Sequence, residues 1–357
     1  MAYKKSRGMQ RSSKIEPSAQ SLYFQTPNFN GSRTATLDLS LCASLANRRF
    51  YRQGINWAVS SVELFSTQTT TGQVISAKLP NTWVMSNAWE KAFRTWQRMN
   101  REALEETPSV RPKFLDFKVF MDSIHHGSDS TITNYNLLPV AVNGVTVSTA
   151  TPGEWEYSKV YIPTAINASA AQTNDFELVA TGSNFPGAGT SGFNAVSLIE
   201  GYAASRGLPN VLDPNTPDDA QDASGSTPHN WMSAMFNDGL VQTSEVIEDM
   251  ITENNIAPYP FENGEVQGAL PGTVFTDTMY PGGANQMSGL EVVDAAYITP
   301  TTIGGVTRLK GSNFPCGLLR LVFNNISMEP GVDFFGIKVN LVPGPHRGYL
   351  CEPMTEM

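Results

Sequence analysis

The chain has 357 residues, 40% of them hydrophobic and 16% charged, and its net charge is −9. The apolar content excludes a wholly disordered chain, and the acidic balance argues against a general nucleic-acid-binding domain. The charges are unevenly placed. The first 53 residues hold nine Lys or Arg and two acids, whereas residues 207–307 hold fourteen Asp or Glu and no Lys or Arg. A basic segment on an acidic body indicates two surfaces with different partners.

The basic segment, residues 1–33, has no apolar period. Its mixture of Lys, Arg, Ser, Gly and Gln cannot bury enough apolar surface to offset the entropy of ordering, so we predict a disordered arm. Clustered positive charges bind phosphates without sequence preference, and salt weakens that binding. A nuclear-import signal, a membrane-surface patch and a solvated tail are the alternatives. The basic residues before Glu16 are Lys4, Lys5, Arg7, Arg11 and Lys14.

Four further arginines extend the basic region to the start of the body, with aromatic residues among them. Aromatic rings beside arginines can stack on unpaired bases. The alternative is that these rings anchor the arm on the core. The arginines, which we assign to nucleic-acid binding, are Arg33, Arg48, Arg49 and Arg52, and the aromatic residues are Tyr23, Phe24, Phe29, Phe50 and Tyr51.

The body begins with segments that alternate with the period of a β-strand. Strands are predicted over residues 34–45, 55–65 and 73–79. The first alternates through leucines at positions 37, 39 and 41, and the second through Trp57 and Val59. Turn-rich connections between short strands also explain the 29 glycines and 23 prolines of the chain.

The clearest helical pattern follows at residues 88–105. Asn87 is the predicted cap, with Glu90 three residues later to reciprocate. The apolar face consists of Trp89, Ala92, Phe93, Trp96, Met99 and Ala103. The opposite face carries Lys91, Arg94, Arg98 and Arg101, for which we expect solvent, with phosphate or a neighbouring subunit as the alternatives.

The middle of the chain mixes strands with long connections. Strands are predicted over residues 113–121, 154–162 and 175–181, and residues 125–151 form a polar loop with a hairpin near Asn143. The segment 193–255 is instead helical and contains an acidic loop. The helices are expected at 193–205, 230–237 and 244–254, and four closing strands at 289–298, 301–309, 316–323 and 335–341.

The order of these elements decides the fold class. Local alternation with frequent turns favours an antiparallel sandwich over a βαβ fold. A jelly roll is the variant that tolerates long insertions between strands. We therefore predict an all-β protein: a single jelly-roll antiparallel β-sandwich over residues 34–357, with helical insertions at about 86–106 and 193–255 and the basic disordered arm over residues 1–33.

Motifs for catalysis or metal binding are not evident. The chain has no phosphate-cradling P-loop, no nucleophile elbow and no zinc-protease signature, so we expect no enzymatic activity. A β-sandwich glycosidase stays open, since its two acids would be distant in sequence. We expect no cofactor. An acidic loop is expected to face solvent, with a calcium site as the alternative; its residues are Asp213, Asp218, Asp219 and Asp222.

Histidine and cysteine residues are too scattered for a metal or redox motif. The adjacent pair His125 and His126 is expected in a surface loop. Three cysteines, Cys42, Cys316 and Cys351, are expected to be reduced thiols. No apolar run approaches the roughly 18 residues needed to cross a membrane, and the basic stretch lacks the apolar segment of a signal peptide. We expect a soluble protein made in a reducing compartment.

Several phrases of the sequence resemble capsid proteins of small circular Rep-encoding single-stranded DNA viruses of the environmental and marine type. The resemblance covers roughly residues 55–320. The phrases are KLPNTW at 78–83, NAW at 87–89, RPKFLDFK at 111–118, GEWE at 153–156, SLIEGY at 197–202, RGLPNVLD at 206–213 and YPGGANQ at 280–286.

The resemblance implies a jelly roll that self-assembles into an icosahedral shell around circular single-stranded DNA, with the basic arm facing the genome. The partners would be other copies of the chain, about 60 in the simplest closed shell, the DNA genome and a host cell-surface receptor, with no membrane. The location would be the virion, with a nuclear stage during assembly. The arm is shorter than in many members of this group, so other cations would share the neutralisation of the genome.

A second class of function also fits the pattern. A β-sandwich that binds carbohydrate or a cell surface, such as a fibre or appendage subunit, would have the same strand pattern but no need for a basic arm. Loss of the arm therefore distinguishes the two classes. Segment 193–255 is acidic and would repel a genome, so we expect it on the outer surface or at subunit contacts.

Overall fold

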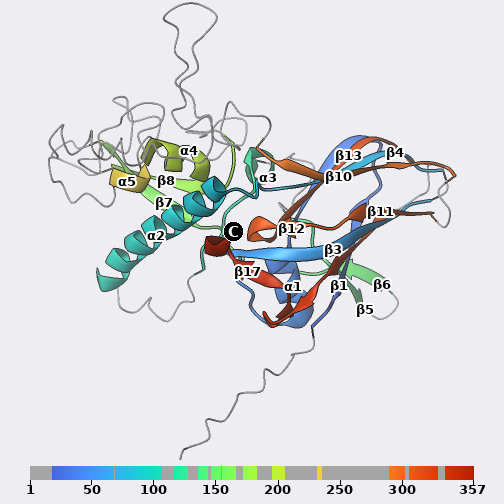
Figure 1. Ribbon diagram of the computed structural model, residues 1–357, viewed down its shortest axis with the longest axis horizontal. Coiled ribbons are helices and arrows are strands. Elements are labelled where there is room, and N and C mark those ends of the chain that lie inside the picture. Colours follow the sequence, from blue (N-terminus) through green and yellow to red (C-terminus); the bar gives the residue numbers. More distant parts are fainter. Residues whose placement is uncertain are drawn as a thin grey trace, which may run out of the picture.

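The computed structural model describes residues 18–67, 69–106, 116–127, 136–143, 146–153, 155–165, 172–182, 195–205, 231–234, 289–301, 305–328 and 334–357. These residues form two regions that lie side by side (Figure 1). One is a β-sandwich built from both ends of the chain, and the other is made of segments between strands β4 and β10.

The sandwich consists of two antiparallel sheets. The order of the first is β1 (Ser21–Pro27), β14 (Phe334–Leu341), β3 (Ile55–Phe65) and β11 (Val306–Lys310), and the short strands β12 (Asn313–Phe314) and β17 (Cys351–Pro353) also pair with β3. The order of the second is β10 (Glu291–Ile298), β4 (Thr71–Lys78), β13 (Leu318–Ser327) and β2 (Gly31–Asp38).

The pairing of the eight main strands of the described sandwich is nested. In chain order the first pairs with the eighth, β1 with β14, and the second with the seventh, β2 with β13. The third pairs with the sixth, β3 with β11, and the fourth with the fifth, β4 with β10. The pairs β3–β14 and β4–β13 join these ribbons into sheets.

The core of the sandwich lies between the two sheets because each strand turns alternate side chains inward. On β14 the buried residues are Phe335, Ile337 and Val339, while the intervening Lys338 is partly exposed. Phe323 of β13 packs edge to face against two rings. Its ring centroid lies 5.3 Å from that of Phe29 and 5.4 Å from that of Phe335 on β14. The predicted all-β sandwich is confirmed.

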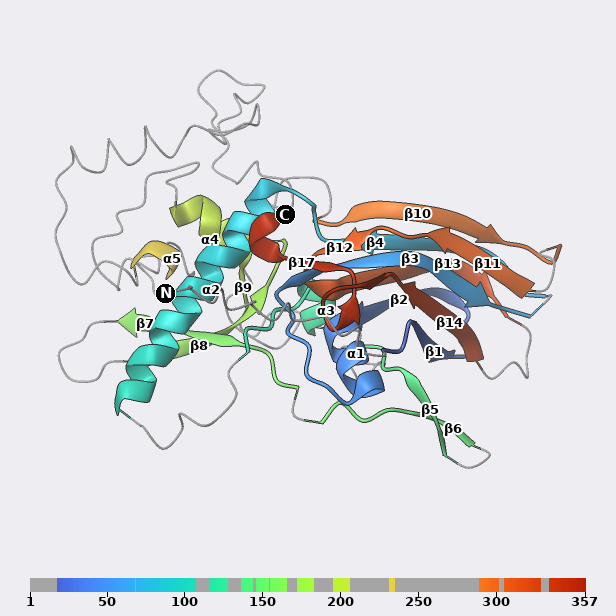
Figure 2. The ribbon, with the colours of Figure 1, turned by 60° about the horizontal axis from the view of Figure 1, so that its bottom comes forward.

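The second region, which we call the insertion, follows β4. A long helix, α2 (Trp83–Glu106), lies against a three-stranded sheet of β7 (Lys159–Ala165), β8 (Gln172–Val179) and β9 (Ala195–Ser197), as Figure 2 shows. The short helices α4 (Leu198–Ser205) and α5 (Trp231–Ala234) pack beside α2. Helix α3 (Ser123–Gly127) follows, and the hairpin of β5 (Val140–Asn143) and β6 (Thr146–Thr149) lies along the sandwich, where Pro139 forms a bridge with Phe24 of β1.

The insertion has its own core around the apolar face of α2. Trp89 stacks on Phe93, and both approach Phe117, as does Trp96. The predicted apolar face is therefore confirmed for the described side chains. The same cluster includes Leu318 and Met354 from the end of the sandwich, so the insertion is built on the sandwich.

Three predictions for the first hundred residues are wrong. Strand β1 and the start of β2 lie within the predicted disordered arm, and residues 18–33 therefore belong to the folded body. Residues 39–45 form helix α1 (Leu39–Asn47) because Asp38 accepts hydrogen bonds from the backbone N–H groups of Ser40 and Leu41. Helix α2 begins at Trp83, where Thr82 Oγ1 accepts from Met85 N, and Asn87 is an internal residue.

Other predictions in the insertion have mixed outcomes. The hairpin near Asn143 is confirmed. The strands predicted at 154–162 and 175–181 are also present, as β7 and β8, but β7 begins and ends later and β8 begins and ends earlier than predicted. Of the strand predicted over 113–121, the described part contributes a single bridge, from Phe120 to Val179. The helix expected at 193–205 is preceded by β9, and the helix at 244–254 lies outside the described residues.

Candidate nucleic-acid interface

The chain enters the sandwich at a defined point beside the C-terminal end of α1. The Ala19 backbone N–H donates to Asn47 Oδ1 at 2.9 Å, and the Ala19 carbonyl accepts from the Tyr349 hydroxyl at 2.8 Å. The Asn47 amide donates to the same Tyr349 oxygen at 2.7 Å. The side chain of Gln20 donates to the Gly348 carbonyl at 3.1 Å. The segment before Ala19 therefore leaves the body next to residues 47 and 348.

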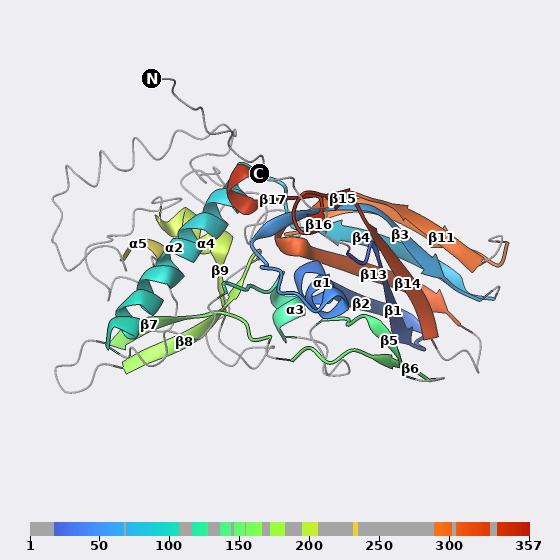
Figure 3. The ribbon, with the colours of Figure 1, turned by 90° about the horizontal axis from the view of Figure 1, so that it is seen from below.

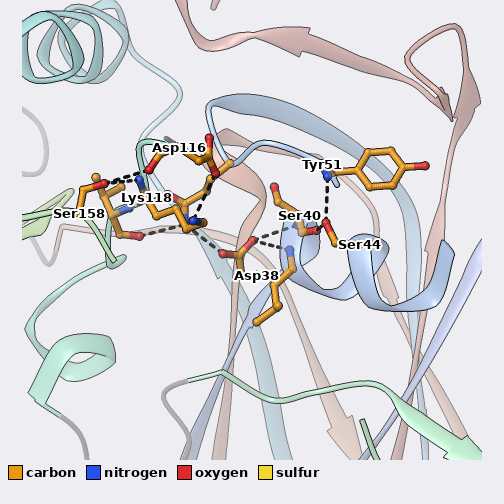
Figure 4. A network of polar contacts seen from close by, with 10 residues as sticks. Asp38, Ser40, Ser44, Tyr51, Asp116, Lys118 and Ser158 are labelled. Carbon is orange, nitrogen blue, oxygen red and sulfur yellow. Dashed lines mark hydrogen bonds and ion pairs between the residues drawn. The ribbon is translucent and has the colours of Figure 1, made fainter. Parts of the chain in front are cut away.

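The loop that follows α1, residues 48–52, carries three of the predicted arginines and Phe50, and we call it the basic loop. Ser44 of α1 fixes its backbone, because Ser44 Oγ accepts from Tyr51 N at 2.9 Å and donates to the Ser40 carbonyl at 2.6 Å. Figure 4 shows this chain of contacts continuing from Ser40 to Asp38. Arg48 has a left-handed backbone conformation, φ 52°, and ends the helix.

A fourth arginine, Arg347, joins the basic loop from the other end of the chain. Its guanidinium donates to the Phe50 carbonyl at 2.6 Å, and its own carbonyl accepts from the Tyr51 hydroxyl at 3.1 Å. Arg347 lies in the turn between the short strands β15 (Pro343–Gly344) and β16 (Gly348–Tyr349), and α1 lies at the same end of the sandwich (Figure 3). We call Arg48, Arg49, Arg52 and Arg347 the basic patch.

The exposure and charge of the basic patch suit a polyanion. Arg48, Arg52 and Arg347 are exposed, and Arg49 is partly buried. Burial and the nearby Arg347 lower the pKa of His346, so this imidazole is neutral at pH 7 and adds no charge. The C-terminal end of α1 favours cations through the helix dipole.

An aromatic pair lies beside the basic patch. The rings of Phe50 and Trp155 are 6.0 Å apart between centroids, and both side chains are partly buried. The Lys118 ammonium lies 4.6 Å from the Trp155 ring centroid and 5.9 Å from that of Phe50. Both distances are within the range of cation–π attraction.

Below these rings a buried polar network joins the basic loop to the insertion. The Gln53 amide donates to Asp38 Oδ2 and to the Val119 carbonyl, each at 3.0 Å, and its oxygen accepts from Val119 N at 2.6 Å. Ser158 Oγ accepts from Lys118 N at 3.0 Å and donates to the Asp116 carbonyl at 3.2 Å (Figure 4). The loop is thus held from α1 and from the insertion.

Burial sets the ionisation of the two carboxyls in this network. Desolvation raises the pKa of Asp38 to about 7, although its hydrogen bonds to Leu41, Gln53 and Ser40 act in the opposite direction. Desolvation also raises the pKa of Asp116, opposed by the positive charges of Lys118 and Arg52. The Lys118 ammonium lies 3.7 Å from Asp116 Oδ2.

The other predicted basic residues are not part of this patch. Arg33 lies on β2 five residues before Asp38, about 17 Å along an extended strand, and its guanidinium lies over the Phe29 ring at 5.5 Å. Lys91 of α2 donates to Ser205 Oγ at 2.8 Å, and Arg94 pairs with Glu90. The five arm residues Lys4, Lys5, Arg7, Arg11 and Lys14 lie outside the described residues.

The aromatic residues divide between the two roles that the sequence left open. Phe24 and Tyr51 are buried in the core of the sandwich, and Phe29 packs against it, so these rings act as anchors. Phe50 lies in the basic loop with its ring 6.0 Å from that of Trp155, and Tyr23 is 50% exposed on β1. Sequence reasoning missed Arg347, Lys118 and Trp155. These three residues are far from the basic loop in sequence, so only their residue types, two basic and one aromatic, could have suggested a role in nucleic-acid binding.

The predicted metal site cannot be assigned to the described structure. Asp213, Asp218, Asp219 and Asp222 lie outside the described residues, and within those residues no group of three or more potential ligands could hold a metal ion. The histidine prediction is wrong, because His125 and His126 are buried. His125 Nε2 lies 2.9 Å from Asn136 Oδ1, and His126 Nε2 lies 2.6 Å from Glu177 Oε2. Cys42, Cys316 and Cys351 are free thiols.

In the part of the chain that the structure describes, no helix is long and apolar enough to cross a membrane. Comparisons with protein-family models, with curated proteins and with solved structures found no match. The functional interpretation therefore depends on the fold, the basic patch and the sequence pattern.

Proposed function

We propose that this chain is a viral capsid protein that self-assembles into an icosahedral shell around circular single-stranded DNA. The observation that carries the proposal is the position of the basic patch, which gathers four arginines around the point where the basic segment joins the sandwich. A subunit with its positive charge concentrated at one end can bind a polyanion at that end and contact neighbouring subunits through its other surfaces.

The strand order supports a jelly roll as the body of such a subunit. The first strand pairs with the eighth, the second with the seventh, the third with the sixth and the fourth with the fifth. This nested pairing arises when one long antiparallel ribbon is wrapped into two sheets. A jelly roll is used both by viral shells and by lectin-like modules. The fold alone therefore fits the carbohydrate-binding or cell-surface alternative equally well, and the basic patch favours the capsid.

The mechanism would be physical and would involve no chemical step. The sandwich supplies a rigid unit, and contacts between unlike surfaces of neighbouring copies close into a symmetric shell, of about 60 copies in the simplest case. The basic segment and the patch lower the repulsion between packaged phosphates. The basic arm can also serve nuclear import during assembly.

Electron microscopy of the purified full-length protein, with absorbance at 260 and 280 nm on the same sample, tests this proposal. We expect uniform closed particles that contain nucleic acid. Replacing the five arm residues Lys4, Lys5, Arg7, Arg11 and Lys14 with Gln should keep the particles but lower their nucleic-acid content. The control is Arg94→Gln with Arg101→Gln, which removes two positive charges from the exposed face of α2 and should leave that content unchanged.

A monodisperse protein without nucleic acid, at low and at high salt, would contradict the proposal and favour the surface-binding module. Equal nucleic-acid content in the arm variant and the α2 control would also contradict it, because the basic segment would then have no role in packaging.

A further inference from the structure

The outer faces of the two sheets of the sandwich differ in polarity. Paired residues cross the first sheet in one row, from β1 through β14 and β3 to β11, and most of them are charged. Lys338 Nζ lies 3.3 Å from Glu63 Oε2, and Glu63 also pairs with Arg308. The row consists of Tyr23, Lys338, Glu63 and Arg308. A charged outer face of this kind suits contact with water.

The corresponding row of the second sheet has no charged side chain. Ile75 and Val322 alternate with the buried Val74 and Phe323, so they point away from the core. The first residue of the row is exposed, and the other three are partly exposed. From β10 through β4 and β13 to β2, the row consists of Ala295, Ile75, Val322 and Thr34.

Strand β10 extends this apolar surface to the end of the second sheet. Val292 and Tyr297 are 67% and 72% exposed, and their pairing with Ala77 and Gln73 places them on the same face as Ile75. Within the described residues β4 is the only strand that pairs with β10, so the other side of β10 is an open sheet edge. Exposed apolar surface beside an open edge is typical of a protein contact. We call this surface the outer apolar patch; it consists of Ile75, Val292, Ala295, Tyr297 and Val322.

The β5–β6 hairpin is a second apolar element that its own subunit leaves exposed. Val142 and Val147 are paired across the hairpin and are 73% and 48% exposed. Ala141 and Ser148, which form the next pair on the opposite face, are exposed as well. Residues 130–153, which include the hairpin, contain no charged side chain. A two-stranded hairpin without a packing partner is marginally stable in water, so a partner is expected.

The base of the hairpin is fixed on the edge of the sandwich opposite β10. Leu137 N donates to the Thr36 carbonyl of β2 at 2.8 Å, and Pro139 forms a bridge with Phe24 of β1. Strands β1 and β2 end the two sheets on this side, whereas β11 and β10 end them on the other. Figure 2 shows the hairpin and β10 on opposite sides of the sandwich. Two unlike surfaces at opposite edges allow copies to join head to tail.

We propose that the β5–β6 hairpin of one copy of this chain docks on the outer apolar patch and the open β10 edge of a second copy. The inference rests on the self-assembly in the proposed function and names the surfaces that join neighbouring subunits. A second copy fits best because the chain itself supplies both halves of the contact. Such a contact is heterologous, so it continues from copy to copy until the assembly closes.

The charges near the outer apolar patch are compatible with this contact. Glu291 of β10 lies 3.9 Å from Lys78 Nζ, and Asp294 Oδ2 accepts from Lys310 N at 2.7 Å. Both acids of β10 therefore have partners within their own subunit. The residues of the hairpin and of the patch are uncharged, so burying them desolvates no charge and removes apolar area from water.

Cross-linking tests whether these two surfaces meet. One preparation of the full-length protein carries Val142→Cys and another carries Tyr297→Cys. Both also carry Cys351→Ser, because Cys42 and Cys316 are buried and Cys351 is the native thiol that is partly exposed. The two preparations are assembled together and treated with a short bismaleimide. We expect a cross-linked dimer from the mixture and none from either preparation alone.

The first sheet provides the matched control. Tyr23 is also an exposed aromatic residue, 50% exposed, but it lies in the charged row beside Lys338. Tyr23→Cys mixed with Val142→Cys should give no cross-linked dimer, because the hairpin has no apolar surface to cover there.

Charged substitutions test whether the contact holds the assembly together. Val142→Glu and Tyr297→Glu each place a carboxylate without a partner in the apolar contact, where desolvation opposes its burial. We expect both variants to lose closed particles at protein concentrations at which the wild type assembles, as seen by light scattering and electron microscopy. Tyr23→Glu should assemble like the wild type.

Two results would overturn the inference: equal cross-linking of Val142→Cys to Tyr23→Cys and to Tyr297→Cys, or normal particles from both glutamate variants. Melting temperatures show whether each variant folds, and the cysteine mixtures decide the question if a glutamate variant does not. Wild-type particles that contain nucleic acid but give no cross-link between positions 142 and 297 would leave the capsid proposal standing while this inference fails. Cross-linked copies without nucleic acid would have the reverse meaning, and a wild type that stays monomeric would contradict both.

Discussion

The sandwich and the insertion bury apolar surface in opposite ways. The sandwich takes its core from the two ends of the chain, so that Leu22 and Phe24 of β1 pack with Ile337 and Val339 of β14. The described insertion instead gathers its core around one helix, with Trp89 and the neighbouring rings of α2 at the centre. The core of the sandwich forms only when segments that are distant in sequence meet. The core of the insertion needs another surface against which α2 can pack.

The sandwich supplies that surface. Ser86 of α2 donates to the Met354 carbonyl at 2.6 Å, and the apolar side chain of Met354 lies in the same cluster as α2. Gly54, which directly precedes β3, lies so close to Trp89 that a Cβ atom on it would approach the Trp89 ring to 2.2 Å. The dependence is therefore one-sided: the insertion needs the sandwich, and the described sandwich core is complete without α2.

The largest expected effect comes from breaking the sandwich core. Phe323→Ala removes a fully buried ring that contacts Phe29 and Phe335, and should lower the free energy of unfolding by about 3–5 kcal/mol. Urea denaturation followed by circular dichroism measures this loss. The matched variant in the insertion is Trp96→Ala, for which hydrogen exchange should increase in α2 and β7–β9 while β3 and β14 stay protected. Equal loss of protection in both regions would show that the dependence is mutual.

The next effect concerns the buried carboxyl between the two regions. The pKa of Asp38 in the folded protein, about 7, is above its ordinary value of 3.8, so between these two pH values the folded state holds a proton that the unfolded state releases. The stabilising contribution is complete below pH 3.8 and is lost as the pH rises through 7. Asp38→Asn cannot ionise, so the variant should gain stability relative to the wild type between pH 5 and pH 8, by about 2 kcal/mol.

Urea denaturation of both proteins at the two pH values gives this difference directly. Burial lowers the pKa of His125 to about 3, and that group would act in the opposite direction below pH 6.5, but it is present in both proteins and cancels. A constant difference between variant and wild type across the range would show that Asp38 does not change its protonation there.

The smallest effect comes from the contact between Gly54 and Trp89. Gly54→Ala places a methyl group against the Trp89 ring and should cost about 1–2 kcal/mol, because the ring must move out of its packed position. The double variant Gly54→Ala with Trp89→Leu should lose less stability than the sum of the two single variants, since the shortened side chain leaves space for the methyl group. Additive losses in thermal unfolding would contradict a direct clash.

Several elements were predictable because their signal is local. The alternation of apolar residues placed β3 at Ile55–Phe65 with its observed bounds, and it located β4, β10, β13 and β14 to within a few residues. The failure at residues 39–45 has an equally local cause. Leucines at 37, 39 and 41 continue the strand period, but the Asp38 cap starts α1 after the first of them.

The candidate site was predictable only in part. Arg48, Arg49 and Arg52 stand near the basic arm in sequence, and Phe50 among them indicated stacking. Arg347 is almost three hundred residues from the basic loop, and Lys118 and Trp155 come from the insertion. No sequence pattern places these residues beside Phe50, because their approach depends on the pairing of β1 with β14 and on the network around Gln53.

The sequence by itself determined β3, β4, β10, β13 and β14 of the sandwich, the apolar face of α2 and the basic character of the first residues, because period and charge are properties of neighbouring residues. The tertiary structure decided the nested pairing of the strands, the burial of His125 and His126, and the gathering of arginines and rings at the root of the arm. These features arise from contacts between distant segments, which form only when the two sheets enclose a common core.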